Sequence, residues 1–303
     1  MSGNPRWFVV VNPASGGGRA ARRWPALAGA LQAAGVGFEA AHTSRPGHAT
    51  QLAREALAAG FRRLLAAGGD GILHEVVNGV MGQSVVAPRE IIVGAAPLGS
   101  GNDWARAHGI PVRPGDMAAC MAACRTVPHD VGLLQFPKAA RTCHFINVAG
   151  AGFDAYVLER LPAGVPRRLG YLLGVLRSLG TFQPPDFELQ VDGIVTRARL
   201  LLTLVAIGPY CGGGMRLAPG ATTDDGKLDV VEVDPVRMPR DLPKLRRIFD
   251  GRLLEESFVR HALATEVLIA ADPPVPVEAD GQLVGTTPVK ASLLPGALRT
   301  LRC

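Results

Sequence analysis

The sequence predicts an α/β domain built on a mostly parallel sheet, followed by a second, β-rich domain. Three observations lead to this fold class. Strand-like and helix-like patterns alternate up to Asp130, and strand-like runs joined by turn dipeptides dominate after it. Apolar residues make up 48% of the 303 residues, which is enough to build two sizeable cores.

The first domain begins with WFVVV at residues 7–11, an apolar run typical of a strand that is buried on both faces. The elements that follow alternate between such runs and apolar residues at helical spacing. In chain order we expect helix 18–35, strand 37–43, helix 47–60, strand 62–67, helix 72–81 and strand 90–97. This order places helices on both faces of a parallel sheet, with ligands at the carboxyl ends of the strands.

The second domain is expected to be rich in strands. The strand-like runs cover residues 142–150, 186–207, 227–233, 264–270, 275–284 and 287–294. VDGI at 191–194 and ADGQ at 279–282 resemble two-residue hairpin turns, and helical stretches are expected near 167–179 and 239–250. We predict a first domain of residues 1–131 with a C-terminal return at about 290–303, and a second domain of residues 132–289.

Three glycine-bearing loops follow strands of the first domain: NPASGGG at 12–18, GGDG at 68–71 and PLGSGNDWAR at 97–106. Glycine permits a positive φ and lets backbone N–H groups approach a ligand closely. Because the carboxyl ends of parallel strands meet at one edge of the sheet, we expect the loops to converge there as an anion site. None matches a Walker A loop or a GxGxxG turn. The three loops together predict a pocket for nucleotide phosphates.

The acidic residues of these loops each have a structural alternative. Asp70 could cap the helix that begins near Gly71, and Asn102 with Asp103 could cap the next one. An acid in a phosphate-binding turn repels the nucleotide unless a cation or a hydroxyl donor intervenes, so we favour a role for Asp70 on magnesium or on the acceptor hydroxyl. Glu75 is either an exposed carboxylate or a group that orders the site.

Charge and cysteine content limit the partners and the compartment. The net charge of +6 and the pI of about 9.4 favour acidic partners such as phosphates or an anionic membrane surface. The sequence has no basic block interleaved with aromatic residues, which is the pattern that would indicate nucleic-acid binding. The five cysteines form no CxxC pair, and we expect buried, reduced thiols and a cytoplasmic location. The longest apolar run, at 200–208, is too short to span a bilayer.

The motifs VVNPASGGGRA, GGDGILHEVVNG, PLGSGNDWAR, GGGMRLAPGATTDDGKLDVVEV and EADGQ resemble, in this order, those of the bacterial diacylglycerol kinase catalytic family. These are soluble lipid kinases that also resemble sphingosine kinases. The resemblance runs over nearly the whole chain. It implies an NAD-kinase-like α/β domain that binds ATP, a β-sandwich domain for the lipid substrate and a metal, and phosphoryl transfer to a lipid hydroxyl.

The resemblance, together with the loops, assigns the site residues. The expected nucleotide contacts are Asn12, Pro13, Ala14, Ser15, Gly16, Thr43, Gly68, Gly69, Asp70, Gly71, Ile72, Leu73, His74, Glu75, Gly99, Ser100, Asn102 and Asp103. A structural magnesium site falls on Asp225 with the backbone carbonyls of Thr222 and Lys227, a set of hard oxygen ligands that suits this ion.

The sequence departs from the family pattern at three positions. Ile72 and Ser100 stand where the family usually has threonine, so a hydroxyl is lost only at Ile72. Gln282 replaces the glutamate that the family uses as general base, and glutamine has no basic carboxylate. Asp280 and Asp70 are the candidates to serve in its place.

We therefore predict a cytoplasmic, peripherally membrane-associated kinase that uses ATP and Mg²⁺ to phosphorylate a lipid such as diacylglycerol in phospholipid metabolism. The catalytic candidates are Asp70, Asp280 and Gln282. The alternatives are an NAD-kinase-like enzyme, and a nucleotide- or lipid-binding protein with little turnover because of Gln282. We also expect a homodimer.

Overall fold

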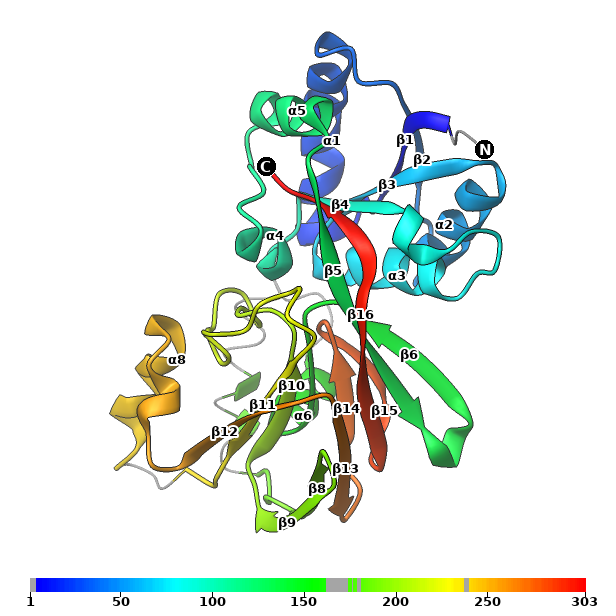
Figure 1. Ribbon diagram of the computed structural model, residues 1–303. Coiled ribbons are helices and arrows are strands. Elements are labelled where there is room, and N and C mark those ends of the chain that lie inside the picture. Colours follow the sequence, from blue (N-terminus) through cyan, green and yellow to red (C-terminus); the bar gives the residue numbers. More distant parts are fainter. Residues whose placement is uncertain (1–3, 162–173, 176, 179–180, 237–239) are drawn as a thin grey trace. The chain divides into compact units, whose positions relative to one another are not determined.

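The computed structural model describes residues 4–161, 174–175, 177–178, 181–236 and 240–303 (Figure 1). The chain divides into two compact units, Met1–His129 with Gly296–Cys303, and Asp130–Pro295. Two long strands, β5 (Thr126–Phe136) and β16 (Val289–Leu301), contribute residues to both units. Most of the helix expected near 167–179 lies outside the described residues.

Unit 1 has the predicted alternation of strands and helices, which confirms the α/β fold class. Its parallel sheet has the strand order β2-β1-β3-β4, and the end of β16 pairs with β4 in parallel. The elements are β1 (Asn4–Val11), α1 (Ser15–Ala33), β2 (Phe38–His42), α2 (His48–Ala58), β3 (Phe61–Gly68), α3 (Asp70–Met81), η1 (Pro88–Glu90), β4 (Ile92–Pro97), α4 (Asp103–Ala107) and α5 (Pro114–Ala123).

Apolar spacing explains why these elements form. The central strand β1 buries Trp7 and residues 9–11, as expected for a parallel strand with both faces covered. In α2 the buried side chains of Leu52, Ala53 and Ala56 recur at helical spacing, which gives one face toward the core and one toward solvent.

The expectation that the cysteines are reduced is wrong for one pair. Cys120, on α5, forms a disulfide with Cys303, and the two Cα atoms are 5.1 Å apart. The partners are 183 residues apart in the sequence, so no local spacing indicated the pair. Among the described residues, Cys124, Cys143 and Cys211 are not part of a disulfide. The argument from reduced thiols to a cytoplasmic location is thereby lost.

Unit 2 contains two sheets. One has the order β12-β11-β10-β7-β14-β15, and the other is formed by β13, β8, β9 and the first part of β16, with β5 and β6 beside it. The elements are β6 (Arg141–Phe145), β7 (Val148–Gly152), α6 (Phe153–Glu159), β8 (Asp186–Val191), β9 (Ile194–Arg199), β10 (Leu202–Ala206), β11 (Leu228–Val233), η2 (Pro137–Ala139), η3 (Leu242–Arg246), α8 (Arg247–Asp250), η4 (Leu253–Glu255), β12 (Val259–Ala264), β13 (Glu266–Asp272), β14 (Pro276–Ala279) and β15 (Gln282–Thr286).

The two sheets of unit 2 share one core. Val205, Val230 and Val277 from the first sheet lie in a single buried cluster with Phe187 and Ile269 from the second. A second cluster packs Leu253 and Phe258 against β7, β10 and β11. This arrangement confirms the β-sandwich-like second domain.

Both predicted hairpin turns are confirmed. Asp192 and Gly193 join β8 to β9, and Asp280 and Gly281 join β14 to β15, each with positive φ at both turn residues. This is the geometry of a two-residue turn that matches the twist of the strands. The expected strand 142–150 is instead two strands, β6 and β7.

No helix of the described part of the chain combines the length and the apolar character needed to cross a bilayer.

Candidate active site

The three glycine-bearing loops of unit 1 meet at the carboxyl ends of β1, β3 and β4. The backbone N–H of Asn12 donates to the carbonyl of Ala67 at 3.0 Å, and the N–H groups of Leu98 and Gly99 donate to the carbonyl of Gly68 at 2.8 and 2.7 Å. The first bond ties the first loop to the end of β3, just before the second loop, and the other two tie the second loop to the third. The backbones of the loops therefore form one continuous surface.

Glycine is required here because two backbones touch. A Cβ on Gly99 would lie 2.4 Å from the Cα of Gly69, and a Cβ on Gly68 would lie 2.7 Å from the side chains of Ser15 and Ile72. Gly69 itself has φ −114° and ψ −168°, an extended conformation that any residue adopts. The GGDG turn thus uses its glycines for close approach and not for positive φ.

The first loop uses its glycines differently. Gly16, Gly17 and Gly18 have φ values of 64°, 66° and 80°, so the entry to α1 is left-handed over three residues. Asn12 supports this turn, since its Oδ1 accepts the N–H of Ala14 at 3.0 Å. Pro13 lies inside the same turn.

Arg19 follows these glycines and was missed by the sequence reasoning. Its Nη1 donates to the carbonyl of Gly99 at 3.3 Å, which places a guanidinium where the first and third loops meet. A basic residue directly after a glycine run was the signal that could have revealed it.

Asp70 does not cap its own helix. Its Oδ1 accepts the backbone N–H of Trp104 at 3.2 Å, so it caps the first turn of α4, 34 residues away. A carboxylate at a helix N-terminus is stabilised by the partial positive charge there. The bond fixes the third loop against the GGDG turn.

Asn102 and Asp103 also serve the third loop. Asn102 has φ 55°, and its side chain both accepts the N–H of Gly99 and donates to the Gly99 carbonyl, each at 3.1 Å. Asp103 is only 3% exposed and pairs with Arg106 at 2.5 Å. Ser100 lies between these groups in the half-buried part of the loop.

Glu75 is neither an exposed carboxylate nor part of the glycine loops. Its two carboxylate oxygens accept the N–H groups of Gly47 and Ala49 at 2.9 and 3.0 Å, so it caps α2 from α3. Thr43 directly follows β2 and precedes α2, and its N–H donates to the carbonyl of Val11 at 2.8 Å. Glu75 therefore orders the segment that follows Thr43.

Besides Asp103, three of the predicted nucleotide contacts have buried side chains. Ile72, Leu73 and His74 lie on the core face of α3 and are 4%, 1% and 7% exposed. Only their backbones are available to a ligand.

Trp104 packs in the core of unit 1. It is 1% exposed and donates its indole N–H to His129 at 3.0 Å, while the ring of His108 stacks on it at 3.9 Å between centroids. Both histidines therefore pack against or bind the Trp104 ring.

In unit 2, Asp280 is held in the turn between β14 and β15. Its carboxylate accepts the backbone N–H groups of Ile146, Asn147 and Val148 at 3.1, 2.9 and 3.3 Å. The residue is 7% exposed. Asp280 thus fixes the start of β7, and Gln282 follows as the first residue of β15.

The predicted metal ligands lie in one loop that precedes β11. Asp225 is exposed and its Oδ1 accepts the N–H of Lys227 at 2.9 Å. Asp130 holds the same loop, since its carboxylate accepts the N–H of Gly226 at 2.8 Å and its N–H donates to the Thr223 carbonyl at 2.7 Å. Within the described residues no group of three or more His, Cys, Asp or Glu side chains is placed to hold a metal. The predicted ligands are the Asp225 carboxylate and the backbone carbonyls of Thr222 and Lys227. Such a set of hard oxygen donors fits Mg²⁺.

A buried carboxylate in α6 was also missed. Asp154 lies over Gly150, where a Cβ would be 2.2 Å from its Oδ2, and its Oδ1 has no hydrogen-bond partner among the described residues. Burial raises the pKa of Asp154 from 3.8 to about 6. A small residue four positions before an acid at a strand–helix junction was the available signal.

Asp154→Asn is expected to stabilise unit 2 at about pH 7.5, by about 1–3 kcal/mol. Above the folded-state pKa of about 6 the carboxylate is charged in both states and its burial is costly. As the pH falls from 6 toward 4, the folded state takes up a proton before the unfolded chain does, so the wild type gains stability and the difference shrinks. Chemical denaturation at about pH 7.5 and about pH 4.5 measures both values. A variant less stable than the wild type at the higher pH would contradict the assignment.

Family models match both parts of the chain. Residues 6–135 match the diacylglycerol kinase catalytic domain, and residues 147–302 match the YegS C-terminal NAD kinase beta sandwich-like domain. The second match covers more than half of the chain.

Individual relatives agree with these matches. A protein of Chromohalobacter salexigens named "Probable lipid kinase YegS-like" is 32% identical over 276 residues, covering 89% of this chain and 85% of its own. A diacylglycerol kinase of Bacillus subtilis is 27% identical, covering 92% of this chain and 90% of its own. These names do not favour the NAD-kinase alternative.

The fold agrees with solved structures as well. A crystal structure of a diacylglycerol kinase from Bacillus anthracis matches with a TM-score of 0.75 at 22% identity, covering 100% of this chain and 98% of the other. The chain therefore belongs to the family of diacylglycerol kinases and YegS-like lipid kinases.

Proposed function

We propose that this protein is a lipid kinase that transfers the γ-phosphoryl group of ATP to a hydroxyl of a lipid such as diacylglycerol. The observation that carries the proposal is the contact of three glycine loops at the carboxyl edge of one parallel sheet, with Gly69 and Gly99 too close for a side chain on Gly99. Such an edge offers backbone donors and helix N-termini to phosphates.

The phosphates of ATP are proposed to lie on the backbones of residues 12–16, 68–75 and 99–103, with Thr43 at the neighbouring strand end. Arg19 adds a positive charge where the first and third loops meet. Phosphoryl transfer depends mainly on positioning and on stabilising the charge of the transferred group. A guanidinium held against the loop backbone suits that task, because it is permanently charged.

Asp70 is proposed as the principal catalytic residue of unit 1. One carboxylate oxygen is fixed by the N–H of Trp104, so the orientation of the group is set before substrate binds. We propose that the carboxylate acts on the acceptor hydroxyl or on a magnesium ion that accompanies the nucleotide.

Magnesium is proposed at a second place, on Asp225 and the carbonyls of Thr222 and Lys227. When bound there, the ion supplies positive charge that holds an acidic loop in one conformation. Asp130 already fixes that loop by two hydrogen bonds, which keeps the oxygen ligands together.

Asp280 is proposed as a positioning residue and not as the general base. Its two oxygens accept three backbone N–H groups, and a proton taken up there would weaken all three bonds. The position of the missing glutamate is Gln282, whose amide cannot accept a proton from a hydroxyl.

Gln282→Glu is expected to raise the turnover rate by roughly tenfold, below the full 10²- to 10⁴-fold that general bases supply. The added carboxylate acts on the transition state, so the affinity for ATP should change little. Steady-state turnover on the best lipid acceptor measures the effect, and Leu283→Glu on the same strand, whose side chain is 46% exposed, controls for added charge. Equal or slower turnover in Gln282→Glu would mean that another group already serves as base.

The direct test of the function is transfer of label from [γ-³²P]ATP across a panel of lipids, with NAD included as a competing acceptor. Labelled lipid with unlabelled NAD supports the proposal. Binding of ATP with no transfer to any lipid would instead assign the protein to nucleotide binding without turnover. We propose that the enzyme works at a membrane surface, where such lipids reside.

A further inference from the structure

A helical segment of unit 2, residues 240–256, lies between β11 and β12 and contains η3, α8 and η4. One side of it is packed. Leu253 is 2% exposed within the second core cluster of unit 2, and Ile248 and Leu254 pack against that cluster. The segment is therefore anchored to the outer face of the six-stranded sheet and has a second face that this core does not use.

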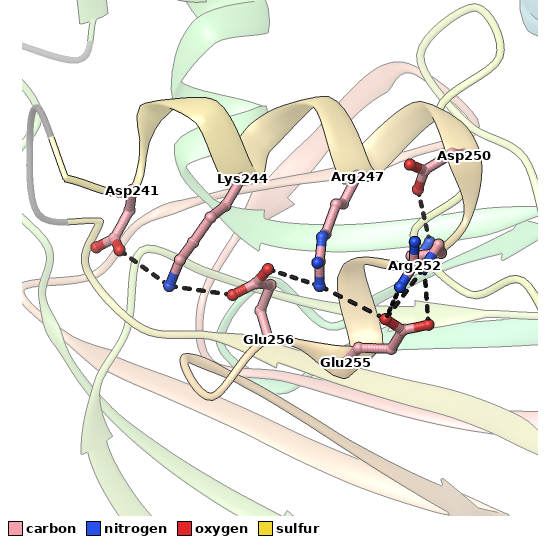
Figure 2. A network of polar contacts seen from close by, with 7 residues as sticks. All are labelled: Asp241, Lys244, Arg247, Asp250, Arg252, Glu255 and Glu256. Atoms are coloured by element: carbon pink, nitrogen blue, oxygen red, sulfur yellow. Dashed lines mark hydrogen bonds and ion pairs between the residues drawn. The ribbon is translucent and has the colours of Figure 1, made fainter.

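Ion pairs hold the segment in shape (Figure 2). Lys244 lies 3.4 Å from Asp241 and 3.1 Å from Glu256, and Arg247 lies 2.9 Å from Glu256. The hydrogen bond with Glu256 raises the pKa of Lys244, so this lysine stays charged at neutral pH. Asp241 and Glu256 are buried, with 6% and 8% exposure. The buried acids of the segment are thus neutralised from within it.

At the exposed end of the network, Arg252 contacts the two acids Asp250 and Glu255. Arg252 pairs with Glu255 at 2.9 Å, and its backbone N–H donates to the carboxylate of Asp250 at 3.0 Å. Arg247 reaches Glu255 at 3.5 Å. Each acid of the segment therefore has a partner inside the segment.

Two arginines of the segment remain outside this network. Arg240 and Arg246 are exposed, and neither has an ion pair or side-chain hydrogen bond with the described residues. Phe249 is 64% exposed and is the only aromatic among the large apolar side chains exposed in the described residues. Arg246 and Phe249 are three positions apart, so they neighbour each other on the helical surface.

We infer that Arg246 and Phe249 form a docking face for an anionic lipid bilayer, with Arg240 as a second exposed arginine of the same segment. An aromatic ring enters the headgroup region while neighbouring arginines attract anionic lipids, which is the pattern of interfacial membrane contacts. The charge is complementary because the segment has five basic residues and four acids, and its two arginines that are unpaired among the described residues are exposed. The inference rests on the proposed function, since a lipid acceptor requires the enzyme to reach a membrane.

The first test is sedimentation of the full chain with phosphatidylcholine vesicles, with and without phosphatidylglycerol. The double variant Arg246→Gln/Phe249→Ser is expected to bind the anionic vesicles about tenfold more weakly than the wild type. The matched control is Arg89→Gln/Val85→Ser, which removes an exposed arginine and a 58%-exposed apolar residue four positions apart in unit 1, and it should bind normally. Equal binding by wild type and the Arg246/Phe249 variant would overturn the inference and leave the face to a protein partner.

The second test places a reporter at the centre of the face. Trp7, Trp24 and Trp104 are at most 8% exposed, so Phe249→Trp adds a fluorophore with a distinct environment. Its emission should shift to the blue on anionic vesicles and be quenched by brominated lipid. Unchanged emission in the presence of bound vesicles would overturn the docking role.

Turnover separates this inference from the proposed function. On a short-chain, water-dispersed diacylglycerol the Arg246→Gln/Phe249→Ser variant should match the wild type, whereas on vesicles it should be slower by about the loss in binding. If the wild type binds vesicles through this face but phosphorylates no lipid, the proposed kinase function is contradicted and the docking inference stands. Loss of turnover on the dispersed substrate as well would overturn the docking role of these residues.

Discussion

Asp70→Asn is expected to lower turnover by roughly 10²- to 10⁴-fold, the range of a lost acid–base group. Asparagine keeps an oxygen that can accept the N–H of Trp104, so α4 stays capped and the fold is retained. What is lost is the negative charge beside the glycine loops. The measurement is steady-state turnover together with thermal unfolding and ATP binding by calorimetry.

The control for this variant is Asp116→Asn, which removes an exposed acid from the first turn of another helix of unit 1. Its turnover should remain near that of the wild type. If Asp70→Asn is folded and retains activity within a few-fold of the wild type, Asp70 is a helix cap only, and the catalytic assignment falls.

Gly99→Ala is expected to separate two of the three loops and to weaken ATP binding on the order of 10²-fold. The added Cβ would lie 2.4 Å from the Cα and 2.8 Å from the N of Gly69. Both are backbone atoms, which cannot rotate away as a side chain can. The free energy of unfolding should also fall, by about 1–3 kcal/mol, because overpacking shifts the backbone.

Gly69→Ala is the matched control for the same contact. Its Cβ would meet the Cα of Gly99 at 3.4 Å, an ordinary van der Waals distance, and its backbone is already extended. This variant should keep wild-type stability. Calorimetry with ATP and denaturant unfolding on both variants test the pair, and tight ATP binding by a folded Gly99→Ala variant would refute the phosphate-binding role of these loops.

Some elements could not be predicted because their sequences lack a clear period. Strand β12 has a mostly exposed pattern, since it lies at the edge of its sheet, and α6 is only seven residues long. Short or edge elements owe their conformation to neighbours in the fold more than to their own apolar pattern.

The sequence by itself determined the features that depend on nearby residues. Apolar runs determined the central strands such as β1, apolar spacing determined helices such as α2, and the Asp–Gly pairs at 192–193 and 280–281 determined two hairpin turns. Each of these follows from the conformational preference of a short stretch and from the face that it buries. The motif order also determined the family.

Only the tertiary structure decided what the polar side chains hold. Asp70 caps α4, Glu75 caps α2, and Asp280 binds the N–H groups at the start of β7, more than 130 residues away. The disulfide between Cys120 and Cys303 is likewise a contact between residues far apart in the sequence. A carboxylate or a thiol has no preferred partner in its own stretch of chain, so its partner is set by which elements pack beside it. That packing is a property of the whole fold and leaves no local pattern in the sequence.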